Sequence, residues 1–258
     1  MARPIADELA AHPGEYDLSA LVLLSSTGVR LSPSVREQLL AMCPNLLISD
    51  IFGSSEAGGT GQLTQGEDGR PRLIPRETAT VLDEALRPVE PGGTGQIARS
   101  GHVPLGYYGD EAATKATFPV IDGVRWALLG DMAEVGRDGS IIVLGRGSMC
   151  INTGGEKVYP EEVEQALTAH PAVIDALVAG IPDERFGQRV AAVVSLRSGT
   201  AADPDALREH CRMTLAGYKV PAKIKFVTQV KRSPTGKADY RWARAVQARS
   251  EPVPPGPP

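Results

Sequence analysis

Apolar and polar positions in the first part of the chain form a pattern that predicts two strands joined by a helix. Residues 21–24 and residues 46–48 are short apolar runs. Between them, residues 33–40 place apolar side chains at helical spacing, behind a proline at the first helical position. Because a helix that joins two strands normally makes them parallel, we expect a βαβ unit with two buried parallel strands.

The pattern changes over residues 60–145, where turn signals recur at short intervals. These signals lie at residues 66–69, 91–93, 121–123 and 137–139. Short apolar runs separate them, which predicts a small antiparallel β subdomain.

After Gly145, longer helix and strand patterns alternate. A proline followed by acidic residues predicts a helix over residues 159–167. Apolar runs predict strands at residues 173–179 and 189–194, and a further helix is predicted at residues 204–214. Together these elements form a compact α+β unit.

The expected fold class is therefore α/β plus α+β: a βαβ unit, a small antiparallel β subdomain and a compact α+β domain. We place residues 1–145 in the first body and residues 146–245 in the second. Residues 246–258, rich in proline, are predicted to be a disordered tail. The boundary near residues 145–148 is where relative domain motion is expected.

Composition and charge exclude several classes of protein. The 258 residues are 42% hydrophobic and carry a net charge of −4, so no overall positive field recruits nucleic acid or an anionic membrane. Apolar stretches stay well short of the roughly 18 residues of a spanning helix, so no transmembrane segment is expected. The start lacks the pattern of a secretory signal. Three cysteines and four histidines are scattered, which predicts reduced thiols and no His/Cys metal site. We expect a soluble, cytoplasmic protein.

The first candidate site is the segment IFGSSEAGG at residues 51–59. Backbone N–H groups and serine hydroxyls bind phosphate oxygens, and a carboxylate such as Glu56 binds Mg²⁺. The segment follows a strand, and open α/β sheets bind ligands at the carboxyl ends of their strands. The alternative is a Gly/Ser turn with a solvated glutamate.

Three more segments carry candidate chemistry. Asp131 after Gly130 has the residue type that holds ribose hydroxyls, although Gly-Asp is also a common turn. Residues 145–162 form a glycine-rich loop that opens an acidic helix, and they suit either close approach to a ligand or an interdomain linker. Lys237 ends the turn sequence RSPTGK and can place a positive charge against phosphate or carboxylate oxygens. Residues 219–244 hold eight Lys/Arg against one acid, which predicts either an anion-binding patch or a solvated face.

In order and spacing, these segments resemble the motifs of the adenylate-forming superfamily. FGSSE at residues 52–56 is similar to its aromatic-Gly-x-Ser/Thr-Glu motif. Gly130-Asp131, Gly145-Arg146 and the sequence PTGK at residues 234–237 match its Gly-Asp, hinge and terminal-lysine motifs. The run GGEKVYPEEVE at residues 154–164 resembles the fatty-acyl-CoA synthetase branch, and the resemblance extends over residues 17–245.

Members of this family form an acyl-adenylate from a carboxylic acid and ATP, release pyrophosphate, and then transfer the acyl group to coenzyme A. The resemblance implies ATP, Mg²⁺ and CoA as ligands and a fatty or sterol-derived acid as substrate. It also implies that residues 1–145 are the C-terminal part of the large AMP-binding domain and residues 146–245 the mobile C-terminal domain.

The resemblance implies roles for individual residues. Phe52 would stack on adenine beside Asp50, Ser55 would contact the α-phosphate, and Asp131 with Arg146 would hold the ribose. The implied nucleotide-binding set is Asp50, Phe52, Gly53, Ser54, Ser55, Asp131 and Arg146.

The remaining implied roles concern catalysis and domain rotation. Glu56 would bind Mg²⁺, and Lys237 would bridge carboxylate and α-phosphate oxygens during adenylation. Ser148 occupies the hinge position, where the family usually has Asp or Lys. Gly154 and Gly155 would line the path of the CoA pantetheine.

One departure from the family is larger. The matching region begins past the middle of the family's sequences, and the Ser/Thr/Gly-rich loop that holds the β- and γ-phosphates is absent. We therefore expect a C-terminal fragment that is inactive alone and associates with a complementary N-terminal half or with itself. The βαβ unit should then expose an apolar face.

Two alternatives differ in their chemistry. A non-catalytic remnant would bind nucleotide, CoA or a partner and release no pyrophosphate. An adenylation domain would deliver its acyl group to a carrier protein.

Overall fold

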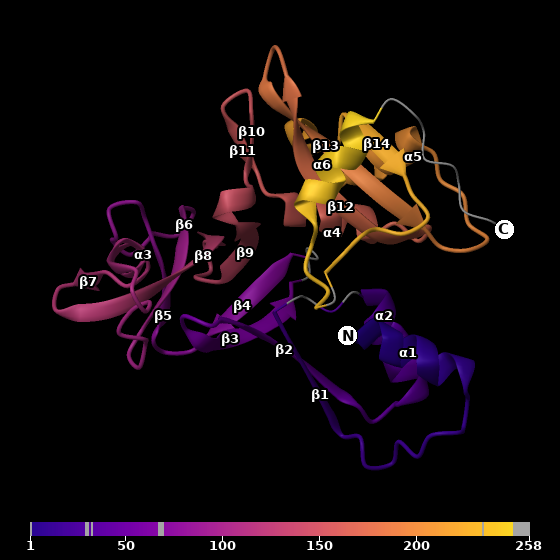
Figure 1. The fold of residues 1–258 in the computed structure, drawn as a ribbon, viewed down its shortest axis with the longest axis horizontal. Helices are drawn as coiled ribbons and strands as arrows, with labels where there is room; N and C mark the ends of the chain where they lie inside the picture. Colours follow the sequence, from indigo (N-terminus) through magenta and orange to yellow (C-terminus); the bar gives the residue numbers. More distant parts are fainter. Residues whose placement is uncertain (1, 29–30, 32, 67–69, 234, 250–258) are drawn as a thin grey trace. The chain divides into compact units, whose positions relative to one another are not determined.

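The fold was examined in a computed structural model that describes residues 2–28, 31, 33–66, 70–233 and 235–249 (Figure 1). The chain divides into two compact units, Met1–Leu144 and Gly145–Pro258. Each unit has its own sheet and its own apolar core, so each is described by itself.

The first unit begins with the predicted βαβ arrangement. Helix α1 (Ala2–Ala11) precedes strand β1 (Leu23–Thr27), helix α2 (Pro33–Met42) and strand β2 (Leu47–Ser54). Strands β1 and β2 pair in parallel, as predicted. Helices α1 and α2 pack together over a small core made of Ala6, Leu31, Val35, Leu39, Cys43 and Leu46.

The strands that follow β2 pair in antiparallel fashion, also as predicted, but they continue the same sheet. The order in this nine-stranded sheet is β1-β2-β3-β4-β9-β8-β6-β5, with β7 paired to β8. Its further elements are β3 (Gly58–Gln65), β4 (Pro71–Pro75), β5 (Ala79–Leu82), β6 (Thr94–Ser100), α3 (Glu111–Thr117), β7 (Val120–Ile121), β8 (Val124–Val135) and β9 (Ile141–Arg146). The turn expected at residues 66–69 lies mostly outside the described residues.

Strands β1 and β2 expose one of their faces, so the expectation of two buried strands was wrong. Leu23 and Leu47, which are register partners, are 59% and 64% exposed. Ile51, which follows Leu47 by four residues on the same face of β2, is also exposed. The physical reason is that successive side chains point to opposite faces, and only one face has α1 and α2 packed on it. The predicted exposed apolar face is confirmed.

This apolar face leads to a first prediction. The purified 258-residue chain is expected to bind a hydrophobic dye or to self-associate, because exposed apolar patches are attractive in water. Replacing Leu23 and Leu47 by lysine should reduce dye fluorescence, whereas Val120→Lys, at an equally exposed valine of β7, should leave it unchanged. A monomeric chain that binds no dye would contradict this prediction.

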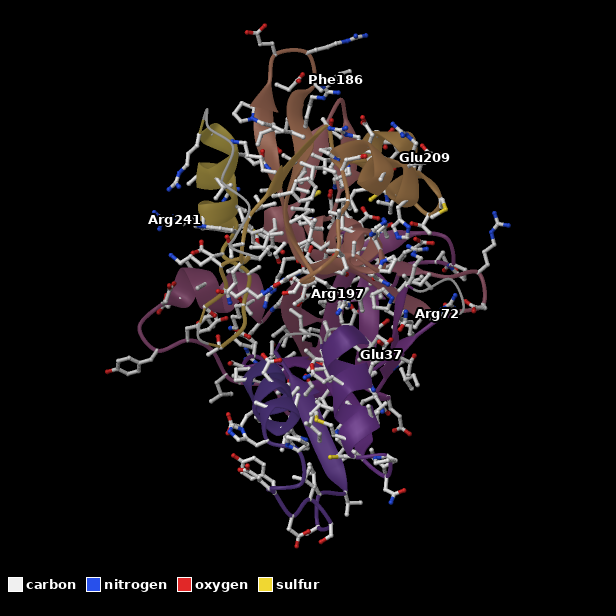
Figure 2. The ribbon with its side chains drawn as sticks, turned by 90° about the vertical axis from the view of Figure 1, so that its right-hand side faces the viewer. Glu37, Arg72, Phe186, Arg197, Glu209 and Arg241 are labelled. Carbon is white, nitrogen blue, oxygen red and sulfur yellow. The ribbon has the colours of Figure 1, made fainter. Side chains whose placement is uncertain are left out.

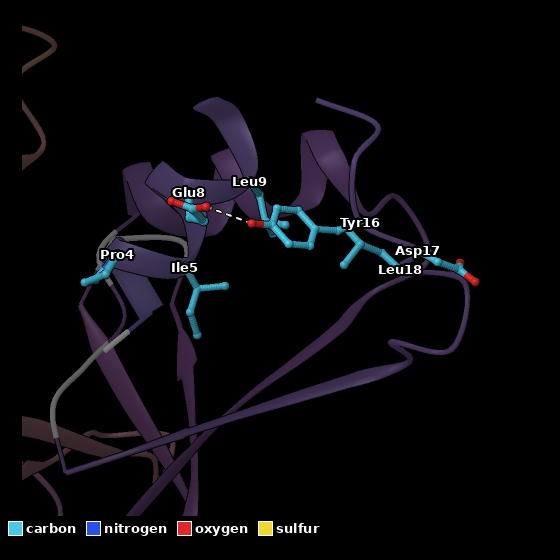
Figure 3. Close-up of a pocket in the computed structure, with 7 residues that line it drawn as sticks. All are labelled: Pro4, Ile5, Glu8, Leu9, Tyr16, Asp17 and Leu18. Carbon is cyan, nitrogen blue, oxygen red and sulfur yellow. Dashed lines mark hydrogen bonds between the residues drawn. The ribbon is translucent and has the colours of Figure 1, made fainter. Parts of the chain in front are cut away.

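A shallow apolar pocket lies beside α1 in the same unit (Figure 3). It has a volume of about 500 Å³, and the Tyr16 hydroxyl donates a 2.7 Å hydrogen bond to Glu8 Oε1 at its wall. None of the candidate site residues lines this pocket.

The second unit is a compact α+β body, and its predicted strands and helices are confirmed. Its five-stranded sheet has the order β11-β10-β13-β12, with β14 parallel to β13. Its elements are β10 (Ile151–Thr153), β11 (Glu156–Val158), α4 (Pro160–Thr168), β12 (Val173–Asp183), β13 (Gly187–Leu196), α5 (Pro204–Arg212), β14 (Lys223–Phe226) and α6 (Tyr240–Ala248), with single 3₁₀ turns at Gly147–Met149 and Gly217–Lys219.

Helices cover both faces of this second sheet. Ala176 and Val178 of β12 pack in one cluster with α4 and α5, whereas Leu177 and Ala179 pack with α6 in another. Strand side chains point alternately to the two faces, so a strand covered on both sides must be apolar throughout. This explains the continuous apolar runs in the sequence.

Helix α6 corrects the boundary that was expected at residue 245. The helix continues to Ala248, and Val246 and Gln247 are buried against the sheet. Residues 246–248 are therefore ordered, because Val246 completes an apolar cluster and the Gln247 amide donates a 2.6 Å hydrogen bond to the Ala192 carbonyl. Residues 250–258 lie outside the described part. No helix among the described residues is long and apolar enough to cross a membrane.

Candidate functional site

The segment around Glu56 forms the end of strand β2 and a hairpin turn, and is not a loop after a strand. Strand β2 runs on to Ser54 and pairs with β3 on the far side of a three-residue turn. The Ala57 N–H donates to the Ser54 carbonyl at 3.3 Å, and Gly58 follows with φ +60°. A type I turn followed by a left-handed glycine is a common three-residue hairpin. Glu56 therefore sits at a defined position in the turn.

Two side chains from distant segments hold this turn. The Tyr107 hydroxyl donates a 2.9 Å hydrogen bond to Glu56 Oε1. The Arg99 guanidinium, from β6, donates to the Ala57 carbonyl. Tyr107 is itself fixed, because its N–H donates to Thr114 Oγ1 at 2.8 Å and its ring packs on buried Phe118 with centroids 5.5 Å apart. Burial and the hydrogen bond to Glu56 raise the pKa of Tyr107, so the hydroxyl keeps its proton to donate.

Strand β2 also carries two buried polar atoms that lack a hydrogen-bond partner in the described part of the chain. Asp50 is 8% exposed and forms an ion pair through Oδ2 with Arg36 of α2. Its Oδ1, and the Oγ of Ser54, have no hydrogen-bond partner among the described residues. Buried polar groups are normally paired, so each of these atoms points to a missing donor or acceptor.

Asp50 lines a polar cavity of about 420 Å³ on the α2 side of the sheet. The other lining residues are Leu31, Arg36, Glu37, Ile48 and Gln62 to Gln65. Phe52 is half-buried and packs against the core formed by the antiparallel strands. Gly53 lies beside Phe52 at a register shift of the β2–β3 pair, and a Cβ at this position would overlap the carbonyl oxygen of Gly58.

Asp131 lies inside strand β8 and does not precede a turn. Gly130 has φ +77°, and the pairing of β6 with β8 shifts register at this point. Residues 129–131 of β8 stand opposite a single residue of β6, and such a β-bulge with a left-handed glycine changes the direction of the next side chain. The Gly-Asp pair thus sets the direction of the Asp131 side chain in the middle of a strand.

In the second unit, the Gly145-Arg146 pair is held by helix α4. The Arg146 N–H donates to Glu161 Oε1 at 3.2 Å. Gly145 has φ +137°, and a Cβ there would lie 2.5 Å from the carboxyl carbon of Glu161. Ser148 follows in the 3₁₀ turn Gly147–Met149 and is exposed. Only glycine fits at residue 145 while Glu161 keeps this position.

Gly154 and Gly155 form the two-residue turn of the β10–β11 hairpin. Their φ values are +60° and +90°, as a type I′ turn requires. The Gly154 N–H donates to the Phe186 carbonyl at 3.0 Å, and a Cβ on Gly154 would approach the Phe186 ring to 3.1 Å. Phe186 lies at the tip of the β12–β13 hairpin (Figure 2). The glycine pair is an ordered turn beside an aromatic ring.

Lys237 lies on a tight turn before α6. Its N–H donates to Ser233 Oγ at 3.1 Å, and its carbonyl accepts from the Ser233 N–H at 2.9 Å. Its side chain is exposed and its ammonium contacts no acceptor in the described part of the chain. Pro234, part of the same motif, lies outside the described residues. The ammonium is therefore free to meet an anionic ligand.

The chain is similar to several known proteins. The family described as "AMP-binding enzyme C-terminal domain" matches residues 162–237. The medium/long-chain-fatty-acid–CoA/3-oxocholest-4-en-26-oate–CoA ligase of Mycolicibacterium smegmatis is 52% identical over 255 residues, covering 95% of this chain and 46% of that protein. The anthranilate CoA ligase AuaEII, solved with anthranoyl-AMP, matches with a TM-score of 0.76 at 25% identity, over 96% of this chain and 49% of that one.

The chain contains a region that matches the AMP-binding enzyme C-terminal domain, and nearly all of it is similar in sequence to CoA ligases. It spans about half the length of the curated relatives that it matches, and a 3-oxocholest-4-en-26-oate–CoA ligase of Rhodococcus rhodochrous, 51% identical, is covered to the same 46%. The expected fold class is confirmed by these structural neighbours.

Sequence reasoning missed several side chains that support the candidate site segments. Tyr107, Arg99 and Glu161 touch candidate residues but lie 51, 42 and 15 residues away from their partners in the sequence. The GYYGD sequence around Tyr107 was a possible signal, because two aromatics between glycines are unusual in a polar turn. No local pattern identified Arg99 or Glu161.

Proposed function

We propose that this chain is the C-terminal half of an acyl-CoA synthetase acting on a medium- or long-chain fatty acid or a sterol-derived acid. The reaction joins the acid to the AMP part of ATP with release of pyrophosphate, and the CoA thiol then displaces AMP to give acyl-CoA. The relatives from M. smegmatis and R. rhodochrous carry CoA-ligase names for these two kinds of acid. Identity of about half over 95% of the chain supports the same chemistry here.

The observation that carries the proposal is the pair of unpartnered polar atoms on strand β2. The buried Asp50 Oδ1 is an acceptor suited to the amino group of adenine, and the Ser54 hydroxyl is a donor suited to a phosphate oxygen. Phe52 lies between them in the sequence and supplies an aromatic ring for base stacking. Asp131 and Arg146 are proposed to hold the ribose, and Ser55 the α-phosphate.

Glu56 fits the role of a magnesium ligand. Mg²⁺ is usually held by one or two carboxylates together with substrate phosphates, and Glu56 offers one fixed carboxylate at the hairpin turn. The ion, when bound, would neutralise phosphate charge during adenylation. The contribution of the chain is to hold that carboxylate in place through Tyr107.

Lys237 is proposed to stabilise charge between the attacking carboxylate and the α-phosphate. Its ammonium contacts no acceptor within the described residues, so it can be placed against developing negative charge without first breaking an ion pair there. Rotation of the second unit about Ser148 would then bring the Gly154-Gly155 turn to the CoA path. Ser148 is exposed within a single 3₁₀ turn, where a change in φ and ψ disturbs little packing.

The experiment that tests this function compares the chain alone with a reconstituted ligase, defined as the chain joined to the N-terminal half of the M. smegmatis relative. Pyrophosphate release is measured with ATP, Mg²⁺ and a panel of fatty acids and 3-oxocholest-4-en-26-oate. We expect release by the reconstituted ligase and none by the chain alone. Release by the chain alone would contradict its dependence on a second half. No release by a folded reconstituted ligase with any acid would favour a binding remnant.

Tyr107 provides a prediction about the magnesium requirement. Tyr107→Phe removes only the hydroxyl that holds Glu56, so the Mg²⁺ concentration for half-maximal adenylation should rise about 10-fold, as for other residues that orient a metal ligand. The rate at saturating Mg²⁺ should change less than about twofold. Tyr108→Phe, at a fully exposed neighbouring tyrosine, is the matched control. An unchanged Mg²⁺ profile in Tyr107→Phe would refute the assignment of this hydrogen bond.

A further inference from the structure

The turn that carries Lys237 is closed by its own backbone and by one serine. Arg232 and Ala238 form an isolated bridge across its base. The Gly236 N–H donates to the Ser233 carbonyl at 2.8 Å, and Gly236 has φ +85°. These bonds define the shape of the turn, but none of them joins it to the rest of the unit.

Arg232 makes that connection. Its Nε and Nη2 donate to Asp175 Oδ2 and Oδ1 at 2.8 and 2.7 Å, a two-pronged ion pair with strand β12. Its Nη1 points to the carbonyl of Gly236, the residue before Lys237, at 3.4 Å. One planar guanidinium thus spans from the strand to the turn, a geometry that the single ammonium of lysine cannot reproduce.

The partner carboxylate is itself held in position. Asp175 lies where the pairing of β12 with β13 shifts register, and its Oδ1 also accepts from the Ala176 N–H at 2.9 Å. Behind it, Glu164 of α4 is half-buried and accepts from the Val178 N–H at 2.9 Å. Burial lowers the pKa of Arg232, but the hydrogen bond and charge of Asp175 and the nearby Glu164 outweigh it, so the guanidinium stays charged.

We propose that Arg232 is a positioning residue, which fixes the Lys237 turn against strand β12 through Asp175 and the Gly236 carbonyl. The catalytic consequence rests on the function proposed above, whereas the structural consequence does not. Without this anchor the internal bonds of the turn open more often, because the Gly236 carbonyl has lost its guanidinium partner. The ammonium of Lys237 then spends less time where charge develops, and adenylation slows.

The structural half of the proposal is tested on the 258-residue chain by hydrogen exchange. In Arg232→Gln, the amides of Ser233, Gly236 and Lys237 should exchange at least about 10-fold faster, while amides of β12 and β13 are unchanged. Arg208→Gln is the matched control, because Arg208 binds the Pro221 and Ala222 carbonyls at 3.1 and 3.2 Å elsewhere in the same unit. Unchanged exchange in the turn of Arg232→Gln would overturn the proposal.

The catalytic half is tested in the reconstituted ligase. Arg232→Gln and Arg232→Lys should each lower kcat for adenylation by about 10- to 100-fold with little change in the KM for ATP. CoA thioester formation from preformed acyl-adenylate should fall less than about threefold. The double variant with Lys237→Ala should be no slower than Lys237→Ala alone, because both changes remove the same contribution, that of the Lys237 ammonium.

The outcomes distinguish a failure of the positioning role of Arg232 from a failure of the proposed function. Faster exchange together with normal adenylation would show that the anchor exists but does not serve Lys237, and would overturn the positioning role. Additive losses in the double variant would do the same. If the unmodified reconstituted ligase forms no adenylate, the proposed function fails, and the exchange experiment still decides whether Arg232 anchors the turn.

Discussion

Replacing Lys237 with alanine is expected to slow acyl-adenylate formation in the reconstituted ligase by about 10²- to 10³-fold. That factor corresponds to about 3–4 kcal/mol, the usual cost of removing one preorganised donor from developing negative charge. The folded state should be little affected, because the side chain is exposed and has no acceptor within the described residues. Pyrophosphate release under single-turnover conditions measures the effect directly.

Two controls make this result specific. Lys231→Ala removes an exposed lysine of the same segment, which lies 3.8 Å from Asp239, and should leave adenylation within about twofold. Thioester formation from preformed acyl-adenylate and CoA should fall less than about threefold in Lys237→Ala, because the α-phosphate chemistry is already complete. Equal losses in both half-reactions would show that Lys237 does not act on the adenylation step.

Replacing Gly53 with alanine is expected to destabilise the first unit by about 3 kcal/mol, the upper range for forcing an extra carbon into a packed site. The new Cβ would overlap the carbonyl oxygen of Gly58 and lie 2.9 Å from its carbon. Both are backbone atoms of the opposite hairpin strand, so the hairpin must open to make room. The expected fall in Tm is about 6–12 °C, measured by circular dichroism or calorimetry.

Gly59→Ala is the matched control in the same hairpin. A Cβ on Gly59 would lie 3.7 Å from Ile51 Cγ2 and 3.8 Å from Arg76 Nη2, which is ordinary contact. Its Tm should change by less than about 2 °C. A Gly53→Ala variant as stable as Gly59→Ala would mean that the β2–β3 hairpin is not closed as described.

The elements predicted best from the sequence are those whose burial pattern is strong and local. Strands β12 and β13 are covered by helices on both faces, so they carry continuous apolar runs at residues 176–179 and 190–194 that were easy to assign. Strand β3 was missed because its sequence, GGTGQLTQ, begins with glycines that resemble a loop. Its pairing with β2 and β4 overrides that low local preference.

The motifs identified the candidate residues in the sequence, but they did not predict the geometry of those residues. The length of β2 put Glu56 on a hairpin turn, because β3 supplies backbone partners as far as Ser54. Asp50 was expected beside adenine, and in the structure one of its oxygens is already paired with Arg36. Only the other oxygen, Oδ1, is left for a ligand.

The sequence by itself determined the parallel βαβ unit, the main strands and helices of the second unit and the order of the motif residues. These follow from periodicity and residue type, which act over a few neighbouring positions. Only the tertiary structure decided what holds those residues in place. Tyr107 meets Glu56 across 51 residues, and Arg232 meets Asp175 across 57. Such contacts depend on strand register and bulges, which are set by the packing of the whole sheet and leave no mark on the local pattern.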